Sequence, residues 1–484
     1  MTHQHRKTTG LELDEAEMRI LGYRVVDMIV EHLGNLRQKS ATGYASRDSL
    51  ERVLREPPPV KGCDYSEVLD LLEDQVFPYA MWSTHPRHFA WVPGPSNFVG
   101  VMADALASGY NLCPTSWLEG SGPSQIELIA VDWLRLWCGF PESAGGIFVS
   151  GGSMANLTAM AIARRVKLND RIEDARVYCS TQIHSSIMRD LRVLGFHRHQ
   201  IRQIDVDEKL QMSLTDLRKV IAHDEASGLR PFCVVGTAGT TNAGTVDPLD
   251  ALADLCQSKN LWLHIDGAYG AAAVLTPTGR RLLSGMHRAD SLAIDPHKWL
   301  FQPFEIGCCL VRDERWLPLT FSERPEYLQD TWADLDEDQE VNFGERGVQL
   351  TRGFRALKLW MTVKVFGEEA LRGAIQVGID NAHLAESILR ELRCFEIVTQ
   401  AQLGVLTFRF TPPIGAQVDL DQLTKAIYDE NRARGHSMLT TTVIRGQTVL
   451  RLCTINPRTT EDDLRSSMCL LAELGHDICA SMRV

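Results

Sequence analysis

The fold is decided by residues 261–299, which open on Leu261-Trp262-Leu263-His264-Ile265-Asp266 and close on Ser291-Leu292-Ala293-Ile294-Asp295-Pro296-His297-Lys298-Trp299. Both runs begin with a short apolar stretch of strand length, and ionisable side chains stand where each stretch ends. A carboxylate such as Asp266 at the end of an apolar strand is costly unless a cation meets it. Lys298, between an apolar strand and a tryptophan, is either an ordinary solvated lysine or a reactive amine.

The chain around these runs alternates between strands and helices. From about residue 85, short β-branched runs are separated by helical stretches, which is typical of a mainly parallel sheet flanked by helices on both faces. The predicted strands are 147–150, 177–180, 232–237, 261–266, 291–294 and 306–312, and the clearest helices are 156–166 and 249–259. Ligands of such α/β sheets bind beyond the carboxyl ends of the strands, so the residues after each strand are the first candidates for chemistry.

The two ends of the chain differ from this central part. Residues 15–33 carry apolar side chains at helical spacing, with Asp14 as the predicted cap, and residues 65–72 form a second short helix. We therefore predict an N-terminal helical arm over 1–84 that packs on another subunit, a large domain over 85–365, and a smaller C-terminal α/β domain over 366–484. The last domain is predicted to contain strands 403–410 and 449–454 and helices 420–434 and 461–474.

Composition disfavours several classes of function. The 484 residues are 44% hydrophobic and 23% charged, and the net charge of -12 without a basic stripe disfavours nucleic acid as a partner. We see neither a signal peptide nor the roughly 18 apolar residues of a membrane span, so we expect a cytoplasmic protein that does not enter a membrane. The 12 cysteines form no CxxC pair and the histidines form no HExxH motif, so we expect free thiols and no metal.

Polar residues gather at the predicted strand ends. Residues 150–156 follow the first strand with two glycines and the start of a helix, which suits a phosphate group. His184 follows the second strand, and residues 237–241 follow the third. Taken singly, these features are a plain turn, a core or surface histidine and a small polar turn. Together with Asp266 and Lys298, they place a phosphate cradle, an imidazole, a carboxylate and an amine at one rim.

This set of groups is what pyridoxal 5'-phosphate (PLP) requires. The cofactor needs a lysine amine for its Schiff base, a carboxylate that keeps its pyridine nitrogen protonated, and hydrogen-bond donors around its phosphate. Lys298 is the candidate for the Schiff base, because a flexible amine in a partly desolvated pocket can hold the cofactor and then be displaced by substrate. Asp266 is the candidate for the partner of the pyridine nitrogen.

The sequence resembles the group II PLP-dependent decarboxylases over nearly its whole length. The motifs occur in the order of the family: His85-Pro86-Arg87-His88-Phe89-Ala90-Trp91, His184-Ser185-Ser186, Gly239-Thr240-Thr241, His264-Ile265-Asp266-Gly267-Ala268-Tyr269, Asp295-Pro296-His297-Lys298-Trp299, Arg352-Gly353-Phe354-Arg355-Ala356-Leu357-Lys358-Leu359-Trp360 and Asn456-Pro457-Arg458-Thr459-Thr460. Within this group the likeness is greatest to the aromatic-L-amino-acid decarboxylase branch, while residues 150–156 are similar to the glutamate decarboxylases.

The resemblance implies a fold-type I, PLP-dependent transferase-like enzyme that forms a homodimer with active sites at the subunit interface. Lys298 matches the lysine that carries the cofactor, Asp266 the partner of the pyridine nitrogen, and His184 the imidazole stacked on the ring. Further matches are Ser153, Met154 and His297 to phosphate contacts, Thr237 and Ala268 to positions lining the ring, Trp91, Val92 and Pro93 to the substrate pocket, and Cys113 and Thr115 to positions contributed by the partner subunit.

One residue departs from the family's pattern. Phe343 stands where we expect a loop tyrosine, and the resemblance gives that tyrosine the role of protonating the substrate carbon after carbon dioxide leaves. A phenylalanine has no proton to give, so oxygen would intercept the reaction, as in related plant enzymes that form an aldehyde. The alternative is that the acidic loop 334–340 shifts the alignment, and that Tyr327 or His184 supplies the proton.

We therefore predict a carboxy-lyase that converts an L-amino acid to its amine and carbon dioxide, with oxygen-dependent formation of an aldehyde as the alternative. An aminotransferase and a catalytically silent, dimeric binding protein are further hypotheses, and the presence of Lys298 with its partners disfavours the silent one. Trp91 favours an aromatic substrate. Val92, Gly94 and Thr115 differ from the bulkier residues of that branch, so an aliphatic or acidic substrate stays open.

Overall fold

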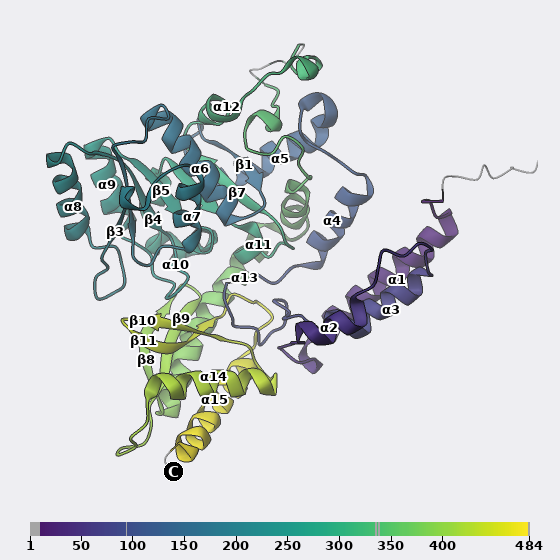
Figure 1. Cartoon of the computed structure of the whole chain (residues 1–484), viewed down its shortest axis with the longest axis vertical. Helices are drawn as coiled ribbons and strands as arrows, with labels where there is room; N and C mark the ends of the chain where they lie inside the picture. The colour runs from purple at the N-terminus through teal and green to yellow at the C-terminus, as the bar shows by residue number, and fades with distance from the viewer. Residues whose placement is uncertain (1–9, 93, 334–335, 337–338, 483–484) are drawn as a thin grey trace, which may run out of the picture.

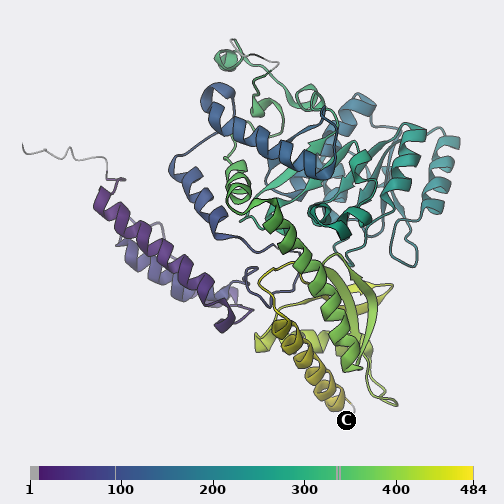
Figure 2. The same cartoon turned by 180° about the vertical axis from the view of Figure 1, so that it is seen from behind.

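The N-terminal helices form an arm that projects from the body of the molecule. The computed structural model describes residues 10–92, 94–333, 336 and 339–482 (Figure 1). The arm contains α1 (Glu15–Gly34), α2 (Arg47–Leu54) and α3 (Tyr65–Gln75). Asp14 caps α1 by accepting hydrogen bonds from the backbone N–H groups of Ala16 and Glu17, which confirms the predicted cap. In both views α1 and α3 lie side by side (Figures 1 and 2), and none of their residues is buried.

A seven-stranded sheet forms the centre of the molecule, in the order β1-β7-β6-β5-β4-β2-β3. Its strands are β1 (Gly145–Val149), β2 (Ala175–Ser180), β3 (Ile201–Ile204), β4 (Arg230–Thr237), β5 (Trp262–Asp266), β6 (Ser291–Ile294) and β7 (Gly307–Val311). β7 runs in the opposite direction to the other six strands, so the predicted mainly parallel sheet is confirmed. The edge strand β3 was not predicted, because its sequence Ile201-Arg202-Gln203-Ile204 lacks a continuous apolar run.

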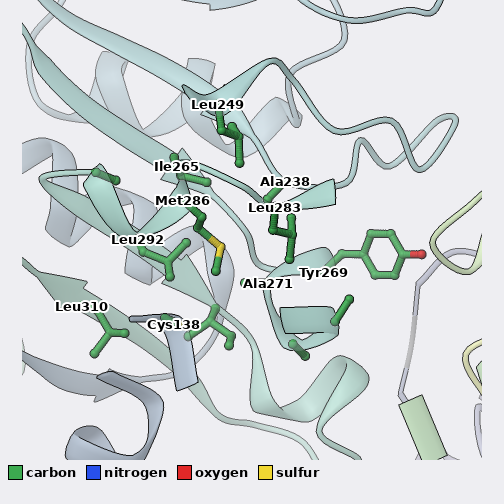
Figure 3. Close-up of a cluster of buried hydrophobic side chains, with 14 of the residues drawn as sticks. Cys138, Ala238, Leu249, Ile265, Tyr269, Ala271, Leu283, Met286, Leu292 and Leu310 are labelled. Carbon is green, nitrogen blue, oxygen red and sulfur yellow. The ribbon is translucent and has the colours of Figure 1, made fainter. Parts of the chain in front are cut away.

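Helices cover both faces of this sheet. The helices of this central part are α4 (Phe98–Gly109), α5 (Trp117–Cys138), α6 (Gly152–Leu168), α7 (Ser185–Val193), α8 (Leu214–Ala226), α9 (Leu249–Lys259), α10 (Pro277–Leu282), α11 (Pro296–Trp299) and α12 (Trp316–Phe321). Short 3-10 helices are η1 (Leu36–Gln38), η2 (Phe77–Tyr79), η3 (Arg198–Gln200), η4 (Gly270–Leu275), η5 (Met286–Arg288), η6 (Glu326–Thr331) and η7 (Phe343–Glu345). Along β5, Trp262 belongs to one apolar cluster whereas Leu263 and Ile265 belong to the other, part of which Figure 3 shows. Both faces of the strand are therefore buried.

The C-terminal part is a four-stranded antiparallel sheet with helices. It contains α13 (Ala356–Leu392), β8 (Phe395–Gln402), β9 (Val405–Phe410), α14 (Leu420–Arg434), β10 (Thr440–Ile444), β11 (Gln447–Cys453) and α15 (Glu461–Ser481), and its strand order is β10-β11-β9-β8. The long helix α13 is interrupted at Gly367, where φ is +78°. The division predicted between residues 365 and 366 falls next to this interruption, and the division into domains stays a prediction.

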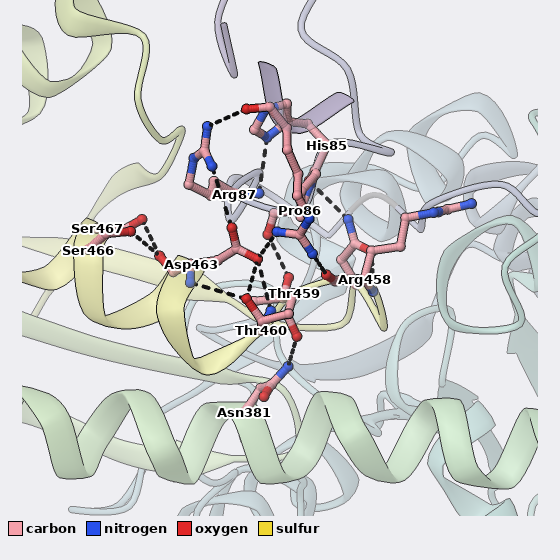
Figure 4. A network of polar contacts seen from close by, with 12 residues as sticks. His85, Pro86, Arg87, Asn381, Arg458, Thr459, Thr460, Asp463, Ser466 and Ser467 are labelled. Carbon is pink, nitrogen blue, oxygen red and sulfur yellow. Dashed lines mark hydrogen bonds and ion pairs between the residues drawn. The ribbon is translucent and has the colours of Figure 1, made fainter. Parts of the chain in front are cut away.

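A polar network holds the segment after the arm against the C-terminal part (Figure 4). Asp463 on α15 forms ion pairs with Arg37 and with Arg87, whose Nη1 lies 3.4 Å from Oδ1. The Thr459 hydroxyl donates to the carbonyl of Pro86 at 2.6 Å, and the Asn456 amide donates to the carbonyl of His85 at 2.9 Å. These contacts fix the start of the segment that leads from His85 to Gly94, which lies against Lys298.

In the portions of the chain that the structure describes, no helix combines the length and the apolar character needed to cross a membrane. The same portions contain no group of three or more histidine, cysteine, aspartate or glutamate side chains placed to hold a metal ion.

Candidate active site

A cavity of about 340 Å³ opens at the carboxyl ends of the parallel strands. Its wall is formed by Ser150, Gly151, Gly152, Ser153, Met154, Asn156, His184, Ser186, Thr237, Gly239, Thr241, Asp266, Ala268, Tyr269, Asp295, His297 and Lys298. All eight residues predicted to contact the cofactor are in this set. The fold therefore brings together at one place side chains that are spread over about 145 positions of the sequence.

Lys298 enters the cavity from α11, which begins directly after β6. Its Nζ lies 3.0 Å from Oδ2 of the buried Asp295, and a quarter of its side chain is exposed, so the amine is both oriented and accessible. The segment that contains Gly94 packs directly against the backbone of Lys298. A Cβ atom added at Gly94 would lie 1.6 Å from the carbonyl oxygen of Lys298, so no other residue fits there without a shift of the backbone.

Asp266 ends β5 and points its carboxylate into the cavity wall. Oδ1 accepts a hydrogen bond from the backbone N–H of Ala268, and Oδ2 accepts one from the side-chain amide of Asn156, both at 3.2 Å. Both donors are neutral, and the structure records no ion pair to this carboxylate from the residues it describes. A buried carboxylate with only neutral donors is suited to accept a further, cationic donor from a ligand.

His184 stands at the N-terminus of α7 with one ring nitrogen occupied. Nδ1 lies 2.9 Å from the hydroxyl of Ser186 and accepts a hydrogen bond from the backbone N–H of Ser186 at 3.3 Å. Burial lowers the pKa of His184, although the charge of Asp266 acts in the opposite direction. The imidazole is therefore neutral near pH 7, and it carries its proton on Nε2.

The start of α6 forms the predicted phosphate cradle. No side chain caps this helix, so the N–H groups of its first turn are free to meet an anion. A Cβ atom at Gly152 would lie 2.8 Å from Oδ2 of Asp295, so a larger residue fits there only after a shift, and a Cβ atom at Gly151 would lie 3.1 Å from the His297 ring. The Thr237 hydroxyl and Oδ1 of Asp295 are buried without a hydrogen-bond partner. The amine, the carboxylate, the imidazole and the cradle fit PLP.

Other residues predicted for the site lie outside the cavity wall. Trp91 is half-exposed with φ of +49°, and Val92 is buried. Pro93 lies outside the described residues. Cys113 and Thr115 contact one another, with Sγ 3.1 Å from Oγ1. None of these four described residues lines the cavity of its own chain, and their roles in the substrate pocket stay predictions.

Phe343 is not brought to the cavity. Its side chain is fully buried within an apolar cluster, and the guanidinium of Arg352 lies 5.1 Å from the centre of its ring. Arg352 in turn forms a buried, two-point ion pair with Glu127 and donates to the carbonyl of Phe148 at 2.6 Å. Tyr327, on η6, is instead 78% exposed. The structure thus favours a packing role for Phe343 and leaves Tyr327 accessible.

Sequence reasoning missed Arg451 and did not separate Asn156 from its glycine-rich neighbours. Arg451 is buried, and it donates from Nε to the carbonyl of Thr241 and from Nη1 to the carbonyl of Trp91, both at 2.7 Å. It therefore ties the cavity wall to the predicted substrate segment. An arginine inside the otherwise apolar run of β11 was the available signal. Asn156 was named only as the end of the phosphate cradle.

Comparison with known proteins identifies the family. Residues 50–411 match the pyridoxal-dependent decarboxylase conserved domain. This chain belongs to the pyridoxal-dependent decarboxylases. It is 48% identical to an aromatic-L-amino-acid decarboxylase of Bacillus atrophaeus, with 98% of each chain covered, and 26% identical to a phenylacetaldehyde synthase of Arabidopsis thaliana, with 95% and 96% covered. A crystal structure of Oryza sativa TDC with PLP and tryptamine superimposes with a TM-score of 0.91 at 25% identity, covering 98% and 99% of the chains.

The comparisons confirm the predicted family, the fold-type I architecture and the use of PLP. As a pyridoxal-dependent decarboxylase, the protein is a PLP-dependent amino-acid carboxy-lyase. The family assignment agrees with the cavity, where the amine of Lys298, the carboxylate of Asp266 and the imidazole of His184 lie in one wall.

The buried His264 of this decarboxylase is predicted to make stability depend on pH. Burial lowers the pKa of His264 from 6.5 to about 4. Because the pKa in the folded state is the lower one, its contribution is complete above pH 6.5 and is lost as the pH falls toward 4. At pH 7 the variant His264→Gln should unfold more easily than the wild type, and this difference should shrink by about 2 kcal/mol at pH 5.

Denaturant unfolding of both proteins at the two pH values measures this difference. His223→Gln, at an exposed position on α8, is the control for replacing a histidine. A difference between wild type and His264→Gln that stays constant from pH 7 to pH 5 would contradict the prediction.

Proposed function

We propose that this enzyme removes the α-carboxylate of aromatic L-amino acids and releases the corresponding amine and carbon dioxide. The observation that carries the proposal is the single cavity wall that joins the amine of Lys298, the carboxylate of Asp266 and the imidazole of His184. The 48% identity to an aromatic-L-amino-acid decarboxylase over nearly the whole of both chains supports the aromatic class of substrate.

Each of these residues has a role that follows from its chemistry. Bound PLP supplies an electron sink for the electron pair left on the substrate carbon. Lys298 would hold the cofactor through its amine, and Asp266 would accept a hydrogen bond from the protonated pyridine nitrogen. His184 would present its neutral ring and Nε2–H to the cofactor. The first turn of α6, with Ser153, Met154 and His297, would hold the phosphate.

The proton that completes the amine is proposed to come from Tyr327. A phenol can donate a proton to the carbon from which carbon dioxide has left, whereas the Phe343 side chain cannot. Tyr327 is 78% exposed on η6, and Asn342 ties this segment to the chain before Phe343 by donating to the carbonyl of Thr331 at 3.0 Å. The burial of Phe343 supports the amine as the proposed product.

The protein is proposed to work as a homodimer that is built on the N-terminal arm. Large apolar side chains of α1 stand in solvent: Met18, Ile20, Tyr23 and Val30 are between 51% and 66% exposed. The arm also borders a cavity of about 920 Å³ lined largely by apolar groups. Such a surface is typical of an interface, and a second copy would cover it. The partner would also bring Cys113 and Thr115 to the neighbouring cavity.

A reducing compartment is proposed as the location. All 12 cysteines are free, and nine of them are buried within the described chain. Thiols in this state are typical of cytosolic proteins. We therefore keep the cytoplasm as the proposed site of action.

Replacement of Lys298 tests the proposed chemistry. The variant Lys298→Ala should lose at least a thousandfold in turnover, because no other amine in the cavity wall can hold the cofactor. The measurement is carbon dioxide release from L-tryptophan, L-tyrosine, L-phenylalanine and L-DOPA, with L-glutamate and L-leucine as comparison substrates. Borohydride treatment followed by peptide mass spectrometry should place the cofactor on Lys298 of the wild type. Full activity in the variant would exclude the mechanism.

Replacement of Tyr327 tests the source of the proton. Tyr327→Phe should lower the amine yield and raise oxygen uptake and peroxide formation. The carbon that lost carbon dioxide then has no proton donor and stays available to react with oxygen. Tyr79→Phe, at another exposed tyrosine, is the matched control and should leave the products unchanged. If Phe343 decided the outcome instead, the wild type would itself form aldehyde and peroxide, and Phe343→Tyr would restore the amine.

Charge on the arm tests the dimer. The double variant Ile20→Glu, Tyr23→Glu should shift the mass in solution from twice 54.2 kDa toward 54.2 kDa, because two carboxylates would be buried at the interface. Light scattering after gel filtration gives the mass. Lys61→Glu, at an exposed position between α2 and α3, is the control. A double variant that keeps the mass of the wild type would show that the arm does not hold the dimer.

A further inference from the structure

A chain of buried hydrogen bonds runs from the cavity wall into the core. Asn156 donates to Oδ2 of Asp266 at 3.2 Å, and its Oδ1 lies 2.9 Å from Nε2 of His264. Nδ1 of His264 lies 2.9 Å from the hydroxyl of Ser291, and the indole N–H of Trp262 donates to that hydroxyl at 2.9 Å. Each of these five residues is at most 6% exposed, so bulk water does not substitute for these contacts.

The two ends of this hydrogen-bond chain decide which group donates and which accepts at every step. The Asp266 carboxylate can only accept hydrogen bonds, and the Trp262 indole can only donate one. The Asn156 amide must therefore turn its NH2 group toward Asp266 and its oxygen toward His264. His264 then has to donate from Nε2. Being neutral and buried, it has to accept at Nδ1 from the hydroxyl of Ser291, which accepts in turn from Trp262.

Asn156 also has a second branch. Its NH2 group donates to the hydroxyl of Ser186 at 3.2 Å. That hydroxyl then directs its own hydrogen to Nδ1 of His184, 2.9 Å away. His184 is left with its proton on Nε2. One amide group thus contacts Asp266 itself on one side and Ser186, the partner of His184, on the other.

We propose that Asn156 is a positioning residue that orients both side chains facing the cofactor ring, Asp266 and His184. This inference rests on the cofactor roles proposed above. Asn156 keeps the carboxylate of Asp266 aimed at the pyridine nitrogen by donating to Oδ2. Through Ser186, whose hydroxyl and backbone N–H both donate to Nδ1, it also holds the His184 ring in the position that presents Nε2–H. The remote residues His264, Ser291 and Trp262 hold the amide in the required orientation.

Three variants test the proposal, with the affinity of the apoenzyme for PLP and the pH dependence of the bound cofactor's visible absorbance as readouts. Asn156→Asp keeps the shape but replaces the NH2 donor by an acceptor, and Asn156→Ala removes both groups. Each should weaken PLP binding about tenfold or more, as expected for loss of a hydrogen bond to a charged group. Each should also shift the pH at which the absorbance changes by one unit or more.

The third variant, Ser291→Ala, acts at a distance from the cavity. It removes the donor to Nδ1 of His264 without changing the cavity wall, and it should shift the absorbance titration in the same direction by a smaller amount. Thr158→Val is the matched control. Thr158 is buried on the same helix, and its hydroxyl donates only within the helix, to the carbonyl of Met154 at 2.8 Å. It should behave like the wild type in both readouts.

The outcomes separate this inference from the proposed function. If the wild type binds PLP on Lys298, and both Asn156→Asp and Ser291→Ala titrate like the wild type, the inference is overturned while the proposed function stands. If the wild-type apoenzyme does not bind PLP, both are overturned. A shift in both variants with no shift in Thr158→Val supports the positioning role of Asn156. A loss of packing alone would lower thermal stability without moving the absorbance titration.

Discussion

The arrangement of the cavity depends on one buried carboxylate. Asp266 ends a strand that is buried on both faces, and its contacts are two neutral amide donors. Burial of a carboxylate without a cation is costly, and the cost is offset here only in part by hydrogen bonds. A ligand that offers a positively charged N–H group here can form the charge-assisted hydrogen bond that Asp266 lacks. This supports the proposed role of Asp266 as the partner of a protonated pyridine nitrogen.

The sheet makes this arrangement possible. The parallel register of β4, β5 and β6 sets Thr237 opposite Asp266 and Asp266 opposite Ala293, so the strand ends reach the same edge. The chain then enters α11, which carries Lys298, within four residues of β6. The antiparallel β7 closes the sheet beside β6 and β1. The first turn of α6, which follows β1, thereby lies close enough to Asp295 that a larger residue at Gly152 fits only after a shift.

Much of this could be predicted because buried strands leave a clear signal. The bounds of β6, α9 and α14 agree with the prediction to the residue, and the ionisable residues at strand ends were assigned to the cavity that they line. The short edge strand β3 could not be predicted, since Arg202 and Gln203 interrupt its apolar pattern. Phe343 could not be placed either. Its burial depends on Arg352 and Glu127, two charged residues that meet only in the folded chain.

The amide of Asn156 illustrates the part of a site that sequence reasoning cannot reach. Residue type alone gives an asparagine one acceptor and two donors, and it leaves their directions open. Here the direction follows from the ends of a hydrogen-bond chain, one of which is an indole that lies deep in the core. The orientation of Asn156, and with it the hydrogen bond to Asp266, is thus determined by residues that lie behind the cavity wall. A substitution at Ser291 acts on the chemistry through this chain, although the residue lies on β6 and faces the interior.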